Sequence, residues 1–189
     1  MGVTEHGALE MRQATPDDID SVMEILGESA RWLSSKGLSQ WSNWYEGREK
    51  VAKQVDAKHV WLLFEDDQLA GTVTIDPIGD ADFWTPDQLA EPAVYVSKLA
   101  IRRSHAGREL GQFMLDWAGD YARRHGYSIV RLDAWRTNHA LHRYYCSRGW
   151  TPMRTVSLPH RKSGALFQKL VAQQGASPVS PESPVSTEP

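Results

Sequence analysis

The stretch from Val94 to Gly111, VYVSKLAIRRSHAGRELG, decides how the rest of the chain is interpreted. Its first half, residues 94–101, is rich in β-branched and apolar residues and predicts a strand. Its second half is a basic, glycine-containing loop that runs into a helix. This arrangement favours phosphate binding, because the first N–H groups of a helix are unpaired and carry the positive end of its dipole.

The apolar residues of this strand change phase near Ser97 and Lys98. Val94 and Val96 share one face of an extended chain, but the later pair, Leu99 and Ile101, follows the opposite phase. A β-bulge would produce such a slip, and bulges often lie beside active sites. A central strand buried on both faces would give the same pattern, so both explanations stay open here.

The composition is that of an ordinary globular chain. Of its 189 residues 41% are hydrophobic and 24% are charged, and the net charge of −3 gives no reason to expect nucleic acid or a membrane as partner. Cys146 is the only cysteine, which excludes an internal disulfide and suits the cytoplasm. We expect no secretion signal, because no apolar run follows a basic region in the first seven residues.

The remaining patterns predict one domain at residues 9–171, between a loose leader at 1–8 and a disordered tail, rich in Pro and Ser, at 172–189. Thr15-Pro16 begins a helix that ends near Gly37, Asp66-Asp67 forms a hairpin turn, and Asn138 begins a short helix. Residues 76–93 read as a loop. The expected order is β-α-α-β-β-β-α-β-α-β-β, which places antiparallel hairpins and one parallel crossover in the same sheet. The predicted fold class is therefore α/β (α+β), with a mixed sheet and helices on both faces.

Aromatic residues are dense in a turn-rich segment after the first predicted helix. They are either a packed lid or a wall for a substrate, and simple packing explains them equally well. The residues concerned are Trp32, Trp41, Trp44 and Tyr45, with Trp84 in the later loop.

Three motifs in this order resemble the GNAT superfamily of N-acyltransferases, over residues 9–170. They are Leu99-Ala100-Ile101, the loop from Ala106 to Gly111, and Asn138-x-x-Leu141-x-x-Tyr144-Tyr145-x-x-x-Gly149-Trp150. Each motif is weak alone, but together they fall on the predicted elements in the right order. The resemblance implies a mostly antiparallel sheet of six to seven strands, acetyl-CoA as co-substrate, no metal, and acetyl transfer to a primary amine in a ternary complex.

The resemblance also implies which residues hold the coenzyme. The backbone of Leu99, Ala100 and Ile101 would pair with the pantetheine arm, and Asn138 would contact that arm. Tyr145 would lie near the sulfur and protonate the leaving thiolate. The pyrophosphate would lie on the backbone N–H groups of Ala106, Gly107, Arg108, Glu109, Leu110 and Gly111.

Two loop residues depart from the family pattern. Ala106 replaces the usual Arg or Gln, which matters little for a backbone contact. Glu109 replaces the first motif glycine; it either points to solvent and caps the helix turn or opposes the pyrophosphate by its charge. Basic side chains near the loop could offset that charge or reach another phosphate: Arg102, Arg103, His105 and Arg108.

Acetyl transfer requires a neutral amine, an oxyanion donor and an acid for the leaving thiolate. The backbone N–H of Leu99 would be the donor and Tyr145 the acid. Ser97 stands where some family members have an acid, so Asp133 is the nearest candidate base, unless it is only a structural partner of Arg131 or Lys98. Other candidate bases are water and the side chains of Asp76, Asp80, Asp82, His139 and His142. Cys146 has no evident base partner, so a covalent acyl-cysteine is not expected.

The acceptor is expected to contact the five aromatic residues named above, which suit a cationic or partly apolar amine. A small-molecule amine is the first hypothesis. Acetylation of a protein N-terminus or lysine is the second, and a non-catalytic acyl-CoA-binding module is the third. Whether the chain forms a homodimer stays open.

Overall fold

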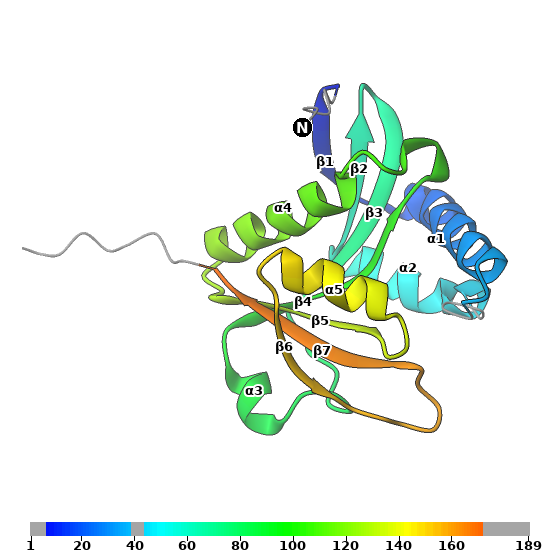
Figure 1. Cartoon of the computed structure of the whole chain (residues 1–189). Coiled ribbons are helices and arrows are strands. Elements are labelled where there is room, and N and C mark those ends of the chain that lie inside the picture. The colour runs from blue at the N-terminus through cyan, green and yellow to red at the C-terminus, as the bar shows by residue number, and fades with distance from the viewer. Residues whose placement is uncertain (1–6, 39–43, 172–189) are drawn as a thin grey trace, which may run out of the picture.

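The computed structural model describes residues 7–38 and 44–171, except for the side chain of Trp44 (Figure 1). Its strands are β1 (Leu9–Gln13), β2 (Val60–Glu65), β3 (Gln68–Asp76), β4 (Ala93–Ile101), β5 (Ile129–Trp135), β6 (Thr151–Thr155) and β7 (Ser163–Leu170). Its α-helices are α1 (Ile19–Ser35), α2 (Arg48–Asp56), α3 (Pro86–Ala90), α4 (Leu110–Arg124) and α5 (His139–Ser147). Three 3-10 turns, η1 (Pro16–Asp18), η2 (Trp44–Gly47) and η3 (Arg103–His105), complete the elements.

The seven strands form one mixed sheet in the order β1-β2-β3-β4-β5-β7-β6. Strands β4 and β5 are parallel, and the other neighbouring pairs are antiparallel. The predicted fold class, a mixed and mostly antiparallel sheet with helices on both faces, is confirmed.

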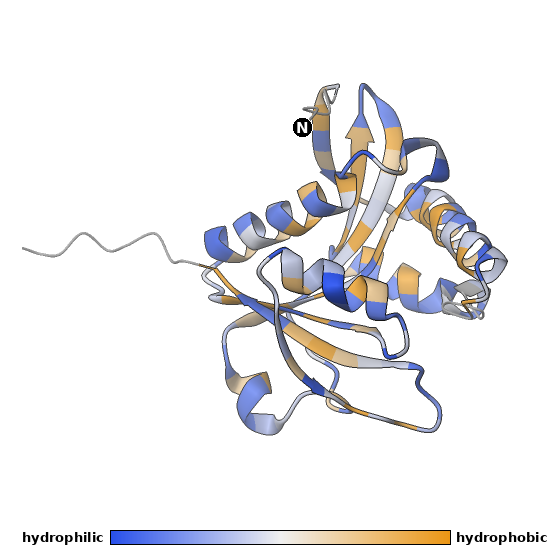
Figure 2. Ribbon diagram, viewed as in Figure 1, coloured by the Kyte–Doolittle hydropathy of each residue, from blue (hydrophilic) through white to orange (hydrophobic). Residues whose placement is uncertain are grey.

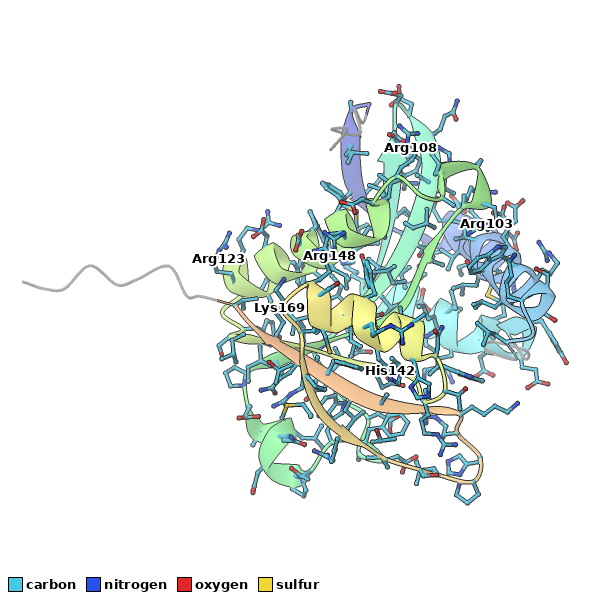
Figure 3. The ribbon with its side chains drawn as sticks, viewed as in Figure 1. Arg103, Arg108, Arg123, His142, Arg148 and Lys169 are labelled. Atoms are coloured by element: carbon cyan, nitrogen blue, oxygen red, sulfur yellow. The ribbon has the colours of Figure 1, made fainter. Side chains whose placement is uncertain are left out.

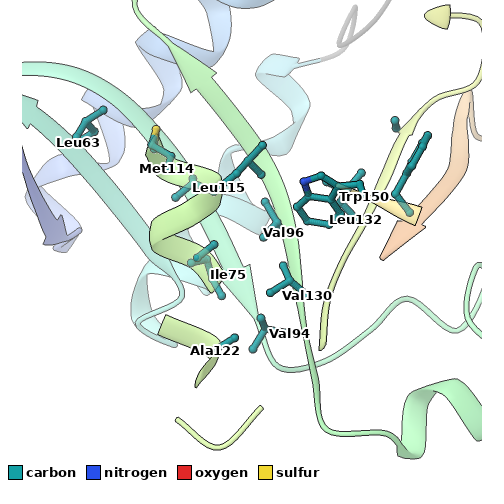
Figure 4. Packing of buried hydrophobic residues seen from close by; sticks show 14 of the residues in the cluster. Leu63, Ile75, Val94, Val96, Met114, Leu115, Ala122, Val130, Leu132 and Trp150 are labelled. Carbon is teal, nitrogen blue, oxygen red and sulfur yellow. The ribbon is translucent and has the colours of Figure 1, made fainter. Parts of the chain in front are cut away.

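Helices cover both faces of this sheet. Met114 and Leu115 of α4 pack against Val94, Val96 and Val130 (Figure 4). On the opposite face, α1 and α2 pack on β2 in a second apolar cluster. Hydrophilic and hydrophobic residues alternate along α4 in Figure 2, as expected for a helix with one buried side. The alternation of strand residues thus divides the core into two layers.

Local signals in the sequence set several boundaries. The Thr15 N–H group donates to Asp18 Oδ2 at 2.8 Å before α1, and Asn138 Oδ1 accepts from the Leu141 N–H group at 3.1 Å before α5. Asp66 and Asp67 have φ values of 46° and 63°, which fits a tight hairpin turn between β2 and β3. These three predictions are confirmed.

The structure differs from the sequence prediction at two places. Residues 76–93 contain the short helix α3, because Thr85 and Gln88 form a reciprocal capping box, with Gln88 N–H donating to Thr85 Oγ1 at 3.3 Å. The leader was expected to include residue 8, but the Ala8 N–H group donates to Asp66 Oδ1 at 2.8 Å and is held in place. The expected tail and residues 1–6 lie outside the described residues. None of the helices in the described part of the chain is long and apolar enough to cross a membrane.

Candidate active site

The predicted β-bulge lies on β4. Thr72 pairs with Ala100 and Thr74 pairs with Ser97, so Lys98 and Leu99 together oppose one residue of β3. Lys98 has a φ of 50°, in the left-handed region. The bulge reverses the alternation of side chains between the two faces of the sheet. The face that packs against α4 carries Val94, Val96, Leu99 and Ile101, whereas Ala100 packs with α1 and α2 on the other face. The phase slip in the sequence therefore had a backbone cause.

Just before the bulge, β4 and β5 part. Their pairing begins at Ala93 with Ile129 and ends at Val96 with Leu132, as far as the described residues show. The space between the diverging ends opens into a cavity of about 1130 Å³. Among its lining residues are several from the family motifs: Leu99, Ala100, Ile101, Gly111, Asn138, Leu141, Tyr144 and Tyr145. The strand ends and two helix starts thus meet in one cavity.

The segment expected to hold the pyrophosphate, residues 106–111, reaches the cavity lining at Gly111, in the first turn of α4. Gly107 has a φ of 80°, which glycine adopts without strain, and Leu110 is buried in the core. Of the expected phosphate-loop residues, Gly111 lines the cavity, whereas Ala106, Gly107, Arg108, Glu109 and Leu110 lie outside its lining. The start of α4 is nevertheless directed at the cavity rim, where its first N–H groups have no intrahelical partner.

The side chain of Glu109 forms a different contact from the one expected. It is the residue before α4, with a φ of 58°, and its side chain makes no capping hydrogen bond within the part of the chain that the structure describes. Its carboxylate instead accepts from Arg148 Nη2 at 2.5 Å. The side chain is 59% exposed, so the expected solvent exposure is observed but the expected cap is wrong.

The basic residues around the loop differ in what they contact; Figure 3 labels Arg103 and Arg108 among them. Arg102 bonds Glu24 and Glu28 of α1, both at 2.7 Å, and Arg108 bonds the buried carboxylate of Glu65 at 2.5 Å. Arg103 lies beside α1 with its guanidinium 4.2 Å from the ring centroid of Trp32, and it lines the cavity. Arg103 is therefore the residue of this group best placed to meet a ligand phosphate.

Tyr145 lies on α5 and lines the cavity. Its ring packs against Trp150 and Phe167, with centroid distances of 5.8 and 5.4 Å. Burial raises the pKa of the Tyr145 phenol far above its ordinary value, with a smaller contribution from Tyr144. The phenol therefore keeps its proton at neutral pH, as a proton donor must.

Asp133 lies on β5 and also lines the cavity. Burial raises the pKa of its carboxyl above the ordinary value, against the opposing effect of a hydrogen bond with Ser163. Arg131 is not its partner, because the Arg131 guanidinium bonds Glu91 and the carbonyl oxygen of Gln88. Lys98 interacts with Asp133 electrostatically but bonds Gln54. Asp133 is thus a half-buried carboxyl that lines the cavity and, among the described residues, forms no ion pair with Arg131 or Lys98.

The other candidate bases are distributed unevenly. Asp76 and Asp80 line the cavity, but each is engaged: Asp76 lies 3.5 Å from His59 Nδ1, and Asp80 lies 2.8 Å from an Arg161 nitrogen. The remaining three, Asp82, His139 and His142, lie outside the cavity lining. His142 is held by the carbonyl oxygen of Trp135, at 2.8 Å from its Nε2.

The aromatic residues expected at the acceptor are only partly gathered there. Trp32 and Trp84 line the cavity, although Trp84 is buried and packs against Tyr95. Tyr45 is 60% exposed and lies outside the lining, so its expected place is not supported. Trp41 lies outside the described residues, as does the side chain of Trp44.

The sequence interpretation missed the basic side of the cavity. Lys98 at the bulge donates to Gln54 Oε1 at 2.7 Å, and Gln54 and Lys50 of α2 line the same cavity. Burial lowers the pKa of Lys98 to about 8, and the charge of Lys50 lowers it further in the same direction. The phase slip near Ser97 and Lys98 was consistent with a bulge there, but no local pattern connects Lys98 with a helix more than forty residues earlier.

Comparison with known proteins gives concordant results. The model described as Acetyltransferase (GNAT) family matches residues 19–150. The uncharacterized N-acetyltransferase YesJ of Bacillus subtilis (strain 168) is 30% identical over 142 residues, which are 72% of this chain and 78% of that protein.

Solved structures share the fold. An acetyltransferase of the GNAT family from Listeria monocytogenes 4b F2365 has a TM-score of 0.74 at 23% identity, covering 86% of this chain and 94% of its own. The PaiA N-acetyltransferase from Thermoplasma acidophilum, solved in complex with coenzyme A, has a TM-score of 0.66 at 15% identity, covering 86% and 99%.

Proposed function

The chain belongs to the Acetyltransferase (GNAT) family, and from that premise we propose that it is an acetyl-CoA-dependent N-acetyltransferase acting on a primary amine of a small molecule. The observation that carries the proposal is the parting of β4 and β5 beside the start of α4. In one cavity it brings together a strand edge that is unpaired among the described residues, a helix N-terminus and the half-buried Tyr145.

The coenzyme fits the side of the cavity nearest α4 and α5. The amide groups of an extended pantetheine arm can pair with the open edge of β4 at Leu99, Ala100 and Ile101, as an added strand does. The N–H groups at the start of α4 suit the pyrophosphate. Asn138 lines this side with its amide, and Arg103 provides a cation near the rim. These residues match what coenzyme A requires.

Direct attack of the amine on acetyl-CoA gives a role to Asp133, Leu99 and Tyr145. The amine nitrogen forms a bond with the acetyl carbonyl carbon while Asp133 takes the amine proton. The backbone N–H of Leu99 donates to the oxyanion. The carbon–sulfur bond then breaks, and Tyr145 gives its proton to the thiolate. A base with a raised pKa is more effective near neutral pH than an ordinary carboxylate, which favours Asp133 over an exposed acid.

Thermal shift and thiol release together test the proposal. Saturating acetyl-CoA should stabilise the fold, by about 2.7 kcal/mol at a concentration 100 times the Kd. Thiol release should then depend on an added amine, and Asp133→Asn should lower it. Binding without turnover on any amine would favour the non-catalytic module, and turnover on peptides alone would favour protein acetylation.

A further inference from the structure

Two lysine ammonium groups from different elements line the part of the cavity next to α2, which is called the acceptor side below. Lys98 comes from the bulge of β4, and its Nζ donates to Gln54 Oε1 of α2 at 2.7 Å. Lys50 lies four residues before Gln54 on the same helix, so the two share one helical face. Lys50, Gln54 and Lys98 all line the cavity. The backbone strain at Lys98, whose φ is 50°, thus accompanies a side chain directed at α2.

Acidic groups near the two lysines are already engaged. Asp80 pairs with Arg161 at 2.8 Å, and Asp76 accepts from the Ile78 N–H group at 2.8 Å. Asp133 bonds Ser163. Within residues 7–38 and 44–171, Lys98 Nζ bonds only the neutral amide oxygen of Gln54, and Lys50 makes no ion pair. On the acceptor side, Lys50 and Lys98 therefore make no ion pair with a carboxylate in this part of the chain, although the charge of Lys50 acts on Asp80 and Asp133 from a distance.

The two positive charges disfavour each other. Burial and the charge of Lys50 lower the pKa of Lys98, and the charges of Asp76 and Asp133 only partly oppose this effect. An anion placed between the two ammonium groups would reverse the repulsion and replace the lost solvent. A neutral or purely cationic acceptor would leave it in place.

We propose that Lys98 and Lys50 form a subsite for an anionic group of the acceptor, so the preferred acceptor is an amine that also carries a carboxylate. This inference rests on the proposed function, because it names the substrate class of the same cavity. The amine would lie near Asp133 and the Leu99 N–H group, and the carboxylate near the two lysines and Gln54. Opposite ends of the acceptor would thus meet groups of opposite charge.

Matched pairs of amines test the substrate class. Thiol release is measured at saturating acetyl-CoA with butylamine against 4-aminobutyrate, 2-phenylethylamine against phenylalanine, and ethylamine against phosphoethanolamine. The acid-bearing amines should have kcat/KM values at least about tenfold higher, as expected for one charge-assisted hydrogen bond. Preference for phosphoethanolamine alone would support the anion subsite but overturn the carboxylate as its ligand, with a phosphate in its place. Equal or better use of the neutral amines would overturn the inference and leave the proposed function intact.

Lysine variants identify the subsite. Lys50→Met and Lys98→Met should each lower kcat/KM for acid-bearing amines by about 10- to 100-fold, mainly through KM, with little change for neutral amines. Lys53→Met is the matched control, because Lys53 lies on the same helix, is 74% exposed and pairs with Glu49. Lys50 is exposed on α2, so its variant keeps the test valid if Lys98→Met does not fold. An equal loss of kcat on both classes of amine would instead make Lys98 a base and overturn the subsite.

A binding measurement separates this inference from turnover. Calorimetry with succinate, on the protein saturated with coenzyme A, should show binding that weakens with salt and is lost in Lys50→Met but kept in Lys53→Met. That result with no turnover on any amine would support the anion subsite while the proposed function fails. Equal binding of succinate to both variants, or no binding to the unmodified protein, would overturn the subsite.

Discussion

Glu109 holds a left-handed backbone conformation, with a φ of 58°, at a position where the family pattern has glycine. Side chains with a Cβ are strained there, whereas glycine is not. Its carboxylate pairs with Arg148 at the surface, where such pairs contribute little. Glu109 therefore strains the backbone, and its ion pair with Arg148 offsets only a small part of that strain.

Glu109→Gly and Glu109→Ala separate these two effects. Both variants lose the pair with Arg148, but only glycine relieves the strain, so Glu109→Gly should be more stable than Glu109→Ala by about 1 kcal/mol. Urea unfolding of the two variants measures the difference. Equal stabilities would show that the left-handed conformation is not maintained in solution.

Tyr145→Phe removes one oxygen and keeps the ring contacts with Trp150 and Phe167. If the phenol protonates the thiolate, turnover should fall by about 10²–10⁴-fold, because that is the usual contribution of a general acid. The Kd of acetyl-CoA, measured by calorimetry, should stay within a few fold. Unchanged turnover would remove Tyr145 from the mechanism.

The start of α4 is the element that the proposal requires to meet a phosphate. A Cβ added at Gly111 would contact only Leu99 Cδ2 within 4 Å, at 3.7 Å, so the free protein has room for it among the described residues. The same Cβ would stand at the helix N-terminus where a pyrophosphate must approach the backbone. Stability and coenzyme affinity should therefore respond to this change in opposite directions.

Gly111→Ala should raise the free energy of unfolding by about 0.5–1 kcal/mol, since alanine favours a helix over glycine. It should weaken acetyl-CoA binding by about tenfold, equivalent to about 1.4 kcal/mol. Gly119→Ala is the control within α4, where the added Cβ would lie 3.4 Å from Val171 Cγ1, away from the cavity. Unchanged affinity in Gly111→Ala would place the phosphate elsewhere.

The sequence predicted the boundaries of helices, strands and turns well because the signals for them are local. The Asn138 cap, the Asp66-Asp67 turn and the slip at Lys98 each depend on residues close together in the chain, and each is observed. The partners of long side chains depend instead on how elements meet. Arg131 reaches Glu91 rather than Asp133, Arg108 reaches Glu65, and Lys98 reaches Gln54. No pattern within one element encodes those choices, so the sequence indicated the bulge, the Asn138 cap and the Asp66-Asp67 turn but not the basic side of the cavity.

For the whole molecule, burying the ammonium of Lys98 makes stability depend on pH. The pKa of Lys98 is about 8 in the folded chain against an ordinary 10.5, so the unfolded chain binds more protons between these values. The free energy of unfolding therefore rises with pH between about 8 and 10.5. Below about pH 8 the full destabilisation from the charged, partly buried ammonium of Lys98 is present.

Lys98→Met should accordingly stabilise the free protein most below pH 8, by about 3 kcal/mol at most, since one pKa unit corresponds to about 1.4 kcal/mol. The gain should shrink as the pH approaches 10.5. Urea unfolding of both proteins at pH 7 and pH 10 checks this. A gain that does not change with pH would mean that the ammonium of Lys98 is well solvated in the folded chain.

The divergence of β4 from β5 also leaves an open strand edge in the middle of a sheet. Open edges with exposed N–H and C=O groups invite pairing between molecules, which leads to aggregation. Two devices that natural proteins use against such pairing, a bulge and a lysine, coincide at Lys98 on this edge. We therefore expect the residue that forms the bulge also to disfavour pairing between ligand-free copies of this chain.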